Sequence, residues 1–262
     1  MDQIIYQVDA FASKLYEGNP AAVCVLKNWL PANIMQNIAM ENNLAETAFL
    51  VKTTKTSYDL RWFTPTTEVD LCGHATLASA HIIFTEYDFP SSEINFETKS
   101  GNLIVKRIAE GKYLMDFPCD EPIKVDEFDH IAKSMNVDAS ECYKGKDDYI
   151  LVLDNEQSVI DARTDIKAMT EIDSRGILLT AIGNKKDFIS RCFFPNVGVD
   201  EDPVTGSAHT LLTPYWAHKL RKNRLSARQL SSRGGDIECI YKGNRVALVG
   251  NAITYMKGII DV

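Results

Sequence analysis

The chain lacks the long apolar run that a membrane-spanning helix needs. None of its apolar stretches approaches the roughly 18 residues required to cross a bilayer, and the first residues carry neither a basic nor an apolar signal segment. The six cysteines are scattered, with no C-x-x-C pair. This usage fits free thiols in a reducing compartment better than a disulfide framework. These absences predict a cytoplasmic protein with no membrane partner.

Signatures of nucleotide, metal and nucleic-acid binding are also missing. The chain has no Walker loop and no strand followed by G-x-G-x-x-G, and its five histidines lack the spacing of a metal motif. With 28 Lys and Arg against 36 Asp and Glu, the net charge is −8, whereas phosphate binding favours a basic face. We therefore expect no cofactor, no metal and no nucleic-acid partner. The one basic cluster, 219–228, is interpreted as a solvated helix end.

What the chain does have is a ten-residue pattern that occurs twice. The pattern R-x-F-x-P-x-x-x-V-D fits residues 61–70 and 191–200, which lie 130 positions apart. Each copy leads into a glycine and small polar residues that open a helix-like stretch, at Gly73 and at Gly206. A period of this length suits a duplicated domain rather than a solenoid. The glycine-led helix starts offer unpaired N–H groups that suit a small anion such as a carboxylate.

The two halves show a similar order of predicted elements. Segment 118–126 contains two prolines and several acids, so it is the best candidate for a linker. We expect an N-terminal lobe of residues 1–117 and a C-terminal lobe of residues 118–262. Hairpins outnumber β-helix-β crossovers, which predicts the α+β class, with a mostly antiparallel or mixed sheet around the long helix of each lobe.

Local patterns predict the individual helices and strands. Pro214 lies inside the second long helix, where it removes a backbone hydrogen bond, so we expect a kink there. The expected helices are 31–41, 73–87, 127–136, 161–171 and 206–220, and the expected strands are 3–10, 21–26, 45–52, 59–63, 94–97, 102–108, 112–117, 149–153, 176–181, 188–194, 237–241, 245–249 and 252–257.

Differences between the two halves indicate where one copy is specialised. A shift of 130 places Glu46 on Gly176, so the acid occurs in one lobe only. A carboxylate that starts an apolar strand is costly unless it has a partner or a task. Burial there is expected to raise the pKa of Glu46 toward the range of a general acid or base. The alternative is a glutamate at a strand end in solvent.

The second half also contains an insertion. Five residues separate the Asp of the repeat from Gly206, whereas two separate it from Gly73. Asp202 lies in this insertion. Asp202 and Ser207 are candidates to cap the following helix, and Asp202 is also a candidate to bind a ligand or a partner acid.

His74 and Cys72 flank the first helix start. The positive end of the helix dipole lowers the pKa of a histidine, which favours a neutral ring that can donate or accept a proton. The alternative is a partly exposed histidine without such a role. Cys72 falls opposite Thr205, so a mechanism with one thiol in each lobe is not available. A Cys72–His74 hydrolase dyad is disfavoured, because two residues that are only two positions apart at a helix start are poorly placed for proton transfer between their side chains.

Six segments, taken together and in order, resemble the PhzF family of phenazine-biosynthesis-like proteins. They are residues 9–11, 18–23, 45–49, 61–65, 72–77 and 201–209. The resemblance implies the fold of diaminopimelate epimerase, with two similar lobes, each a barrel-like sheet around a central helix, and an active site between them. It also implies that the final strand 251–262 can join the N-terminal lobe and that the protein is a homodimer.

The resemblance implies roles for individual residues. Glu46 matches the acid/base carboxylate of the family, and Cys72 is the only thiol in place where the epimerase branch of the superfamily uses two. The residues that match the substrate pocket are Gly73 and His74 on one side and Asp202, Gly206 and Ser207 on the other.

We therefore expect a cofactor-independent isomerase that acts on a small carboxylate-bearing metabolite in the cleft between the lobes. Glu46 would move the proton, while His74 and Asp202 would orient the substrate and set the protonation state of Glu46. Two alternatives stay open. One is a one-thiol epimerase or racemase in which Cys72 pairs with Glu46, and the other is a non-catalytic ligand-binding protein on the same fold.

Overall fold

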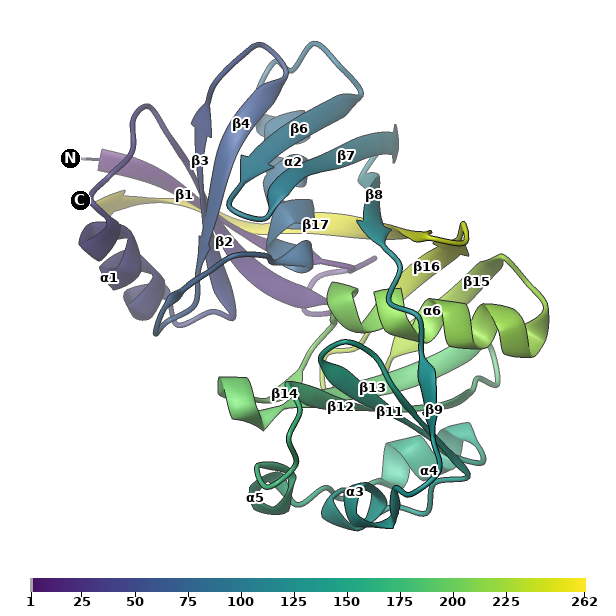
Figure 1. Cartoon of the computed structure of the whole chain (residues 1–262). Coiled ribbons are helices and arrows are strands. Elements are labelled where there is room, and N and C mark those ends of the chain that lie inside the picture. Colours follow the sequence, from purple (N-terminus) through teal and green to yellow (C-terminus); the bar gives the residue numbers. More distant parts are fainter. Residues whose placement is uncertain (1) are drawn as a thin grey trace. The chain divides into compact units, whose positions relative to one another are not determined.

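A computed structural model describes residues 2–262, which form two compact units (Figure 1). Unit 1 runs to Asp116 and resumes at Val249, and unit 2 is Phe117–Leu248. None of the helices within residues 2–262 is long and apolar enough to cross a membrane. All six cysteines are free thiols.

Unit 1 contains two helices and most of the strands in the first half of the chain. Its last strand, β17, begins in unit 2 and continues into unit 1. The elements are β1 (Asp2–Ala10), β2 (Asn19–Leu26), α1 (Ala32–Asn42), β3 (Glu46–Lys52), β4 (Ser57–Phe63), β5 (Glu68–Val69), α2 (Gly73–Glu86), β6 (Glu93–Thr98), β7 (Gly101–Ala109), β8 (Lys112–Pro118) and β17 (Arg245–Asp261).

The strands of unit 1 close into a ring around α2. Strand β1 pairs with β17 and β2, and the ladder continues through β3, β4, β6 and β7 to β8, which pairs with β17 again. The β2–β3 and β4–β6 pairs are parallel, and the β1–β17, β1–β2, β3–β4, β6–β7 and β7–β8 pairs are antiparallel. Helix α2 contacts β1, β2, β3 and β7 and is buried along its whole length from His74 to Phe84. A helix that is apolar on all sides is expected at such a position.

Unit 2 repeats this order of elements around α6. Its elements are β9 (Ile123–Val125), α3 (Asp129–Ser134), β10 (Glu141–Lys144), β11 (Asp148–Val152), α4 (Glu156–Asp161), α5 (Ile166–Met169), β12 (Gly176–Ile182), β13 (Phe188–Phe194), the 3-10 helix η1 (Pro195–Val197), β14 (Val199–Asp202), α6 (Gly206–Leu220), β15 (Arg224–Gln229) and β16 (Gly235–Tyr241).

The strand pairings confirm the duplicated α+β architecture. The parallel pairs β11–β12 and β13–β15 occupy the places of β2–β3 and β4–β6, and the β12–β13 and β15–β16 pairs are antiparallel like β3–β4 and β6–β7. Glu46 and Gly176 each begin the second strand of the first parallel pair in their unit, where they pair with Ala21 and Asp148 respectively. The alignment of Glu46 with Gly176 is therefore a structural equivalence.

The repeated arginine has the same structural role in both units. Arg61 donates from Nε and Nη2 to the two carboxylate oxygens of Glu68, at 2.7 and 2.8 Å. Arg191 makes the same bidentate contact with Glu201, at 2.7 and 2.9 Å. The hydrogen bond from Arg61 lowers the pKa of Glu68 to about 2. Such charge-assisted forks fix the strand to the segment that follows it.

Several predicted elements need correction. The expected helix 161–171 is replaced by the two short helices α4 and α5, and the expected strands 245–249 and 252–257 form one long strand, β17. The expected linker 118–126 contributes strand β9, which pairs with the unpredicted strand β10. These short strands alternate weakly in sequence and owe their conformation to pairing partners.

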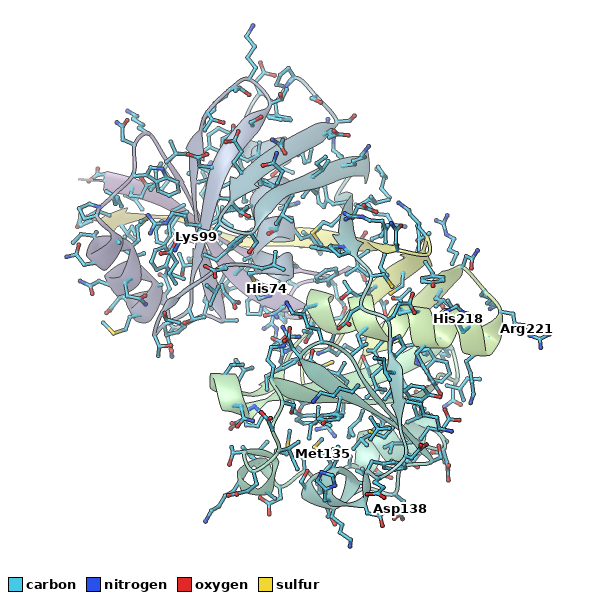
Figure 2. The ribbon with its side chains drawn as sticks, in the orientation of Figure 1. His74, Lys99, Met135, Asp138, His218 and Arg221 are labelled. Atoms are coloured by element: carbon cyan, nitrogen blue, oxygen red, sulfur yellow. The ribbon has the colours of Figure 1, made fainter. Side chains whose placement is uncertain are left out.

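The basic cluster was only partly a helix end. Helix α6 ends at Leu220, and His218 and Arg221 lie at its C-terminal end (Figure 2). The rest of the cluster forms β15, which is buried at alternate residues. Pro214 lies inside α6, and the expected kink there stays a prediction.

Gly176 is predicted to tolerate no side chain. A Cβ atom there would collide with the ring of Phe194 and would lie 2.6 Å from the carbonyl oxygen of Phe193. We expect Gly176→Ala to lower the free energy of unfolding in urea by about 1–3 kcal/mol, as for other overpacked cores. Gly258→Ala is the matched control, since its Cβ would meet only Ile5, at 3.8 Å. Equal stabilities of the two variants would contradict this account.

His209 predicts a pH dependence of stability. It is fully buried in α6, and burial lowers its pKa from 6.5 to about 4, although Nδ1 bonds to the Thr205 carbonyl at 2.7 Å. Below pH 6.5 the imidazole of His209 binds a proton in the unfolded chain but stays neutral in the folded chain. The free energy of unfolding therefore decreases as the pH falls from 6.5 toward 4.

We expect urea unfolding to show this loss. Relative to His209→Gln, which does not titrate, the wild type should lose about 2 kcal/mol between pH 7 and pH 5. Parallel stability curves for the two proteins would show that His209 is not the source.

Candidate active site

Glu46 lies at the beginning of a strand in the closed sheet of unit 1. It is the first residue of β3, and its parallel pairing with Ala21 of β2 fixes the direction of the strand. Its side chain is 18% exposed. The alternative of a solvated strand-end glutamate is therefore wrong for the described structure, because most of the carboxylate is out of contact with water.

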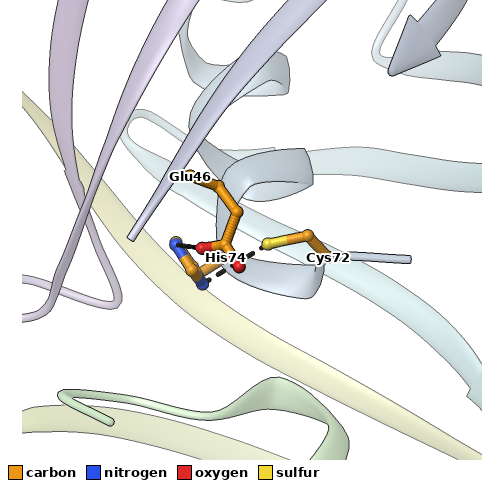
Figure 3. Close-up of side chains that lie close together, drawn as sticks. All are labelled: Glu46, Cys72 and His74. Atoms are coloured by element: carbon orange, nitrogen blue, oxygen red, sulfur yellow. Dashed lines mark hydrogen bonds and ion pairs between the residues drawn. The ribbon is translucent and has the colours of Figure 1, made fainter. Parts of the chain in front are cut away.

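The imidazole of His74 is the principal partner of Glu46. His74 is the second residue of α2 and is buried. Its Nε2 atom lies 2.9 Å from Oε2 of Glu46. On the other side of the ring, Nδ1 lies 3.5 Å from Sγ of Cys72 and 3.2 Å from Nδ2 of the buried Asn19. In Figure 3, dashed lines join the imidazole to the carboxylate and to the thiol.

The pairing of Glu46 with His74 decides the charge of both groups. Burial raises the pKa of Glu46, but the charge and hydrogen bond of His74 outweigh it, and the net pKa is lowered. Burial lowers the pKa of His74, but Cys72 and Glu46 outweigh it, and the net pKa is raised well above 6.5. A raised Glu46 pKa and a neutral His74 ring were therefore wrong predictions, since each treated one group without its partner.

Cys72 contacts His74 more closely than the sequence suggested. The residue is the N-cap of α2 in extended conformation, and this turn brings Sγ to Nδ1 although the residues are only two apart. The geometric objection to a Cys72–His74 pair was therefore wrong. Burial, followed by the nearby Glu46 carboxylate, nevertheless raises the pKa of Cys72. This shift disfavours the thiolate, which is the more nucleophilic form of a cysteine.

The same three side chains carry atoms that bind metals. One ligand atom each from Glu46, Cys72 and His74 lies within 4.8 Å of the others. His74, however, turns Nε2 toward the carboxylate and Nδ1 toward the sulfur. The three ligand atoms are nevertheless close enough together to reach one ion, and the same contacts also allow proton transfer. The absence of a metal stays a prediction.

In unit 2, the inserted segment forms a hydrogen-bonded turn before α6. The N-cap of α6 is Thr205, with no side-chain cap, so the predicted capping by Asp202 or Ser207 was wrong. Asp202 instead accepts a hydrogen bond from the hydroxyl of Thr205. The side chain of Gln229 also bonds to this turn. Gln229 was missed in the sequence, because nothing local connects it with a segment 24 residues earlier.

A second group that sequence reasoning missed lies beside Ser207. Arg175 donates from Nε to Asp148 Oδ1 at 2.9 Å, from Nη2 to the other oxygen of Asp148, and from Nη2 to Ser207 Oγ at 3.2 Å. Its guanidinium carbon lies 5.2 Å from the centre of the Phe194 ring. The only sequence signal was a charged residue immediately before Gly176.

The predicted site residues thus fall into two groups. Unit 1 holds Glu46, Gly73 and His74, with His74 and Glu46 in contact, and unit 2 holds Asp202 with the α6 start, formed by Gly206 and Ser207. Each group is defined within its own unit. The expected cleft between the lobes stays a prediction of the sequence.

Comparisons with known proteins agree with this architecture. Residues 8–258 match the PhzC-PhzF family model, described as phenazine biosynthesis-like protein. A protein of Pseudomonas aeruginosa that is named an uncharacterized isomerase is 48% identical over 263 residues, covering 100% of both chains. The human phenazine biosynthesis-like domain-containing protein is 36% identical and covers 97% of each chain.

Solved structures are similar over the same length. A PhzF-family protein of Enterococcus faecalis superposes with a TM-score of 0.96 at 44% identity and covers 100% of both chains. A probable proline racemase of Agrobacterium radiobacter superposes with a TM-score of 0.64 at 9% identity, covering 99% of this chain and 93% of the racemase. The racemase shows the fold alone, and it confirms the epimerase-like α+β class. These matches show that the chain belongs to the PhzF family of phenazine biosynthesis-like proteins and is an isomerase.

Proposed function

We propose that this isomerase moves a proton on a small carboxylate-bearing metabolite by general acid/base catalysis, without a cofactor. The observation that carries the proposal is the contact of 2.9 Å between the Glu46 carboxylate and the His74 imidazole, both largely buried. Isomerisation needs a group that removes a proton and returns it elsewhere, and a positioned carboxylate can do both.

Glu46 is the group that takes the proton from carbon. Its lowered pKa keeps it ionised at neutral pH, so it is ready to act as a base. His74, with its raised pKa, sets this protonation state and places a positive charge where negative charge develops on the substrate. A fixed charge in a site with little water stabilises such a transition state more than it would in solution.

The substrate carboxylate binds at the helix starts. Backbone N–H groups near Gly73 and near Gly206 are unpaired within their helices, and the positive dipole end favours an anion. In unit 2, the Arg175 guanidinium, whose charge is paired with Asp148, also donates a hydrogen bond to Ser207. Asp202 orients a polar group of the substrate. The protein acts in the cytoplasm as a homodimer.

A one-thiol epimerase is the second candidate, and a specific contact favours it. Cys72 Sγ lies 3.5 Å from His74 Nδ1 and is hydrogen-bonded to the Glu46 carboxylate, so in this mechanism Glu46 accepts the proton of the thiol. The raised pKa of Cys72 argues for the carboxylate mechanism.

Replacing Glu46 tests the proposal directly. Purified protein is incubated in D2O with a panel of small carboxylates and dihydroaromatic acids, and deuterium uptake is measured by mass spectrometry. We expect Glu46→Gln to lower the exchange rate by at least about 100-fold, the usual contribution of general acid/base catalysis.

Glu68→Gln is the control, since this carboxylate pairs with Arg61 outside the cluster. Exchange that survives in Glu46→Gln would place the base elsewhere. Clear binding of a compound, with no exchange of any compound by the wild type, would favour a non-catalytic binding protein.

Replacing Cys72 separates the two mechanisms. Cys72→Ser keeps a small polar group beside His74, so we expect the exchange rate to fall by less than about tenfold, or 1.4 kcal/mol in the barrier. Cys24→Ser is the control for loss of a buried thiol away from the cluster. Complete loss of exchange in Cys72→Ser alone would support the one-thiol mechanism.

A further inference from the structure

Gln229 connects β15 to the inserted turn that carries Asp202. It is the last residue of β15 and is completely buried. Its Oε1 accepts a hydrogen bond from the backbone N–H of Thr205 at 2.9 Å. Its Nε2 donates to the backbone carbonyl of Asp202 at 2.7 Å and lies 3.1 Å from the Thr205 hydroxyl oxygen. A single side chain therefore contacts both ends of the turn.

The two backbone partners fix the orientation of the Gln229 amide. A backbone N–H can only donate and a backbone carbonyl can only accept. Turning the amide over would place its NH2 group against the Thr205 N–H and its oxygen against the Asp202 carbonyl, which removes both bonds. The atom beside the Thr205 hydroxyl is therefore nitrogen, which is a donor.

This orientation sets the direction of the next hydrogen bond. A threonine hydroxyl has one hydrogen to donate. Because Nε2 of Gln229 donates to the hydroxyl oxygen, the hydroxyl hydrogen is directed to the other neighbour, Oδ2 of Asp202. Hydrogen bonds in such a series polarise one another and strengthen the last one. Asp202 is thereby held as an acceptor.

We propose that Gln229 is a positioning residue, which acts through the Thr205 hydroxyl to hold the Asp202 carboxylate in one orientation as a hydrogen-bond acceptor. The functional meaning of this inference rests on the proposed role of Asp202 in binding the substrate. The hydrogen-bond relay itself does not.

The described residues of unit 1 form no equivalent relay, which argues against a role in folding alone. The counterpart of Gln229 is Thr98, the last residue of β6, and its hydroxyl donates to the Gly101 carbonyl at 2.6 Å. The counterpart of Thr205 is Cys72. A closed sheet of the same design therefore forms without the relay, which accompanies only the insertion that carries Asp202.

The test must separate positioning from simple capping of α6. Gln229→Glu keeps an oxygen that accepts from the Thr205 N–H but replaces the donor with a second acceptor, so the Thr205 hydroxyl turns toward residue 229. Gln229→Met removes both interactions. Thr205→Val removes the hydroxyl and identifies its NMR signal by difference.

The measurement is NMR at neutral pH of protein labelled with 13C at aspartate and threonine, without substrate. In the wild type we expect a slowly exchanging Thr205 hydroxyl proton and an Asp202 carboxyl carbon whose shift changes in Thr205→Val. Gln229→Glu and Gln229→Met should both lose the hydroxyl signal and move the Asp202 carbon. Adding Thr205→Val to Gln229→Met should move that carbon no further. Urea unfolding shows which variants keep the fold.

An unchanged Thr205 hydroxyl and Asp202 carbon in folded Gln229→Glu would overturn the proposal and leave Gln229 as a cap only. A further shift on adding Thr205→Val would also overturn it, because Gln229 would then act by another route. This experiment needs no turnover, so its failure is distinct from failure of the deuterium-exchange assay with Glu46→Gln.

Discussion

The buried ion pair between Glu46 and His74 is the constraint on which the rest of unit 1 depends. Removing two charged groups from water costs solvation free energy. Their mutual attraction offsets this cost only while the carboxylate and the imidazole stay in contact. The register comes from a parallel strand pair and from a helix start enclosed by a closed sheet. Movement of either element by a few ångströms would leave a buried charge without its partner. The closed sheet therefore functions as a rigid frame for this one contact.

Duplication allowed the two units to diverge at matching positions. Where unit 1 has Glu46 and His74 in contact, unit 2 has Gly176 and Ser207, with Arg175 bound to Ser207. The imidazole of one copy thus corresponds to a hydroxyl in the other, and the carboxylate has no counterpart, because a glycine that follows Arg175 stands at its position. Gly176 cannot carry a side chain because the Phe194 ring occupies the space, and the same ring lies beneath Arg175. The difference between the copies is therefore built into the packing.

Much of this could be predicted from the sequence, because the repeat, the long helices and Glu46 are marked by local patterns. Helix 206–220 has the predicted bounds. Weakly patterned strands such as β9 and β10 could not be predicted, since their conformation comes from partners far away in the chain. The pKa shifts of Glu46 and His74 were predicted in the wrong direction for a related reason. A pKa depends on the neighbouring groups, and a linear sequence does not give their distances.

Strand β17 passes from unit 2 into unit 1, where it pairs with both β1 and β8. A ribosome therefore completes every residue of unit 2 before it makes the strand that closes the sheet of unit 1. During synthesis, strands β1 and β8 of the first half therefore lack their partner strand while the second half emerges and can fold. The frame around Glu46 is consequently finished last, although its residues are among the first to be translated, and chaperones have their longest opportunity to bind these edges.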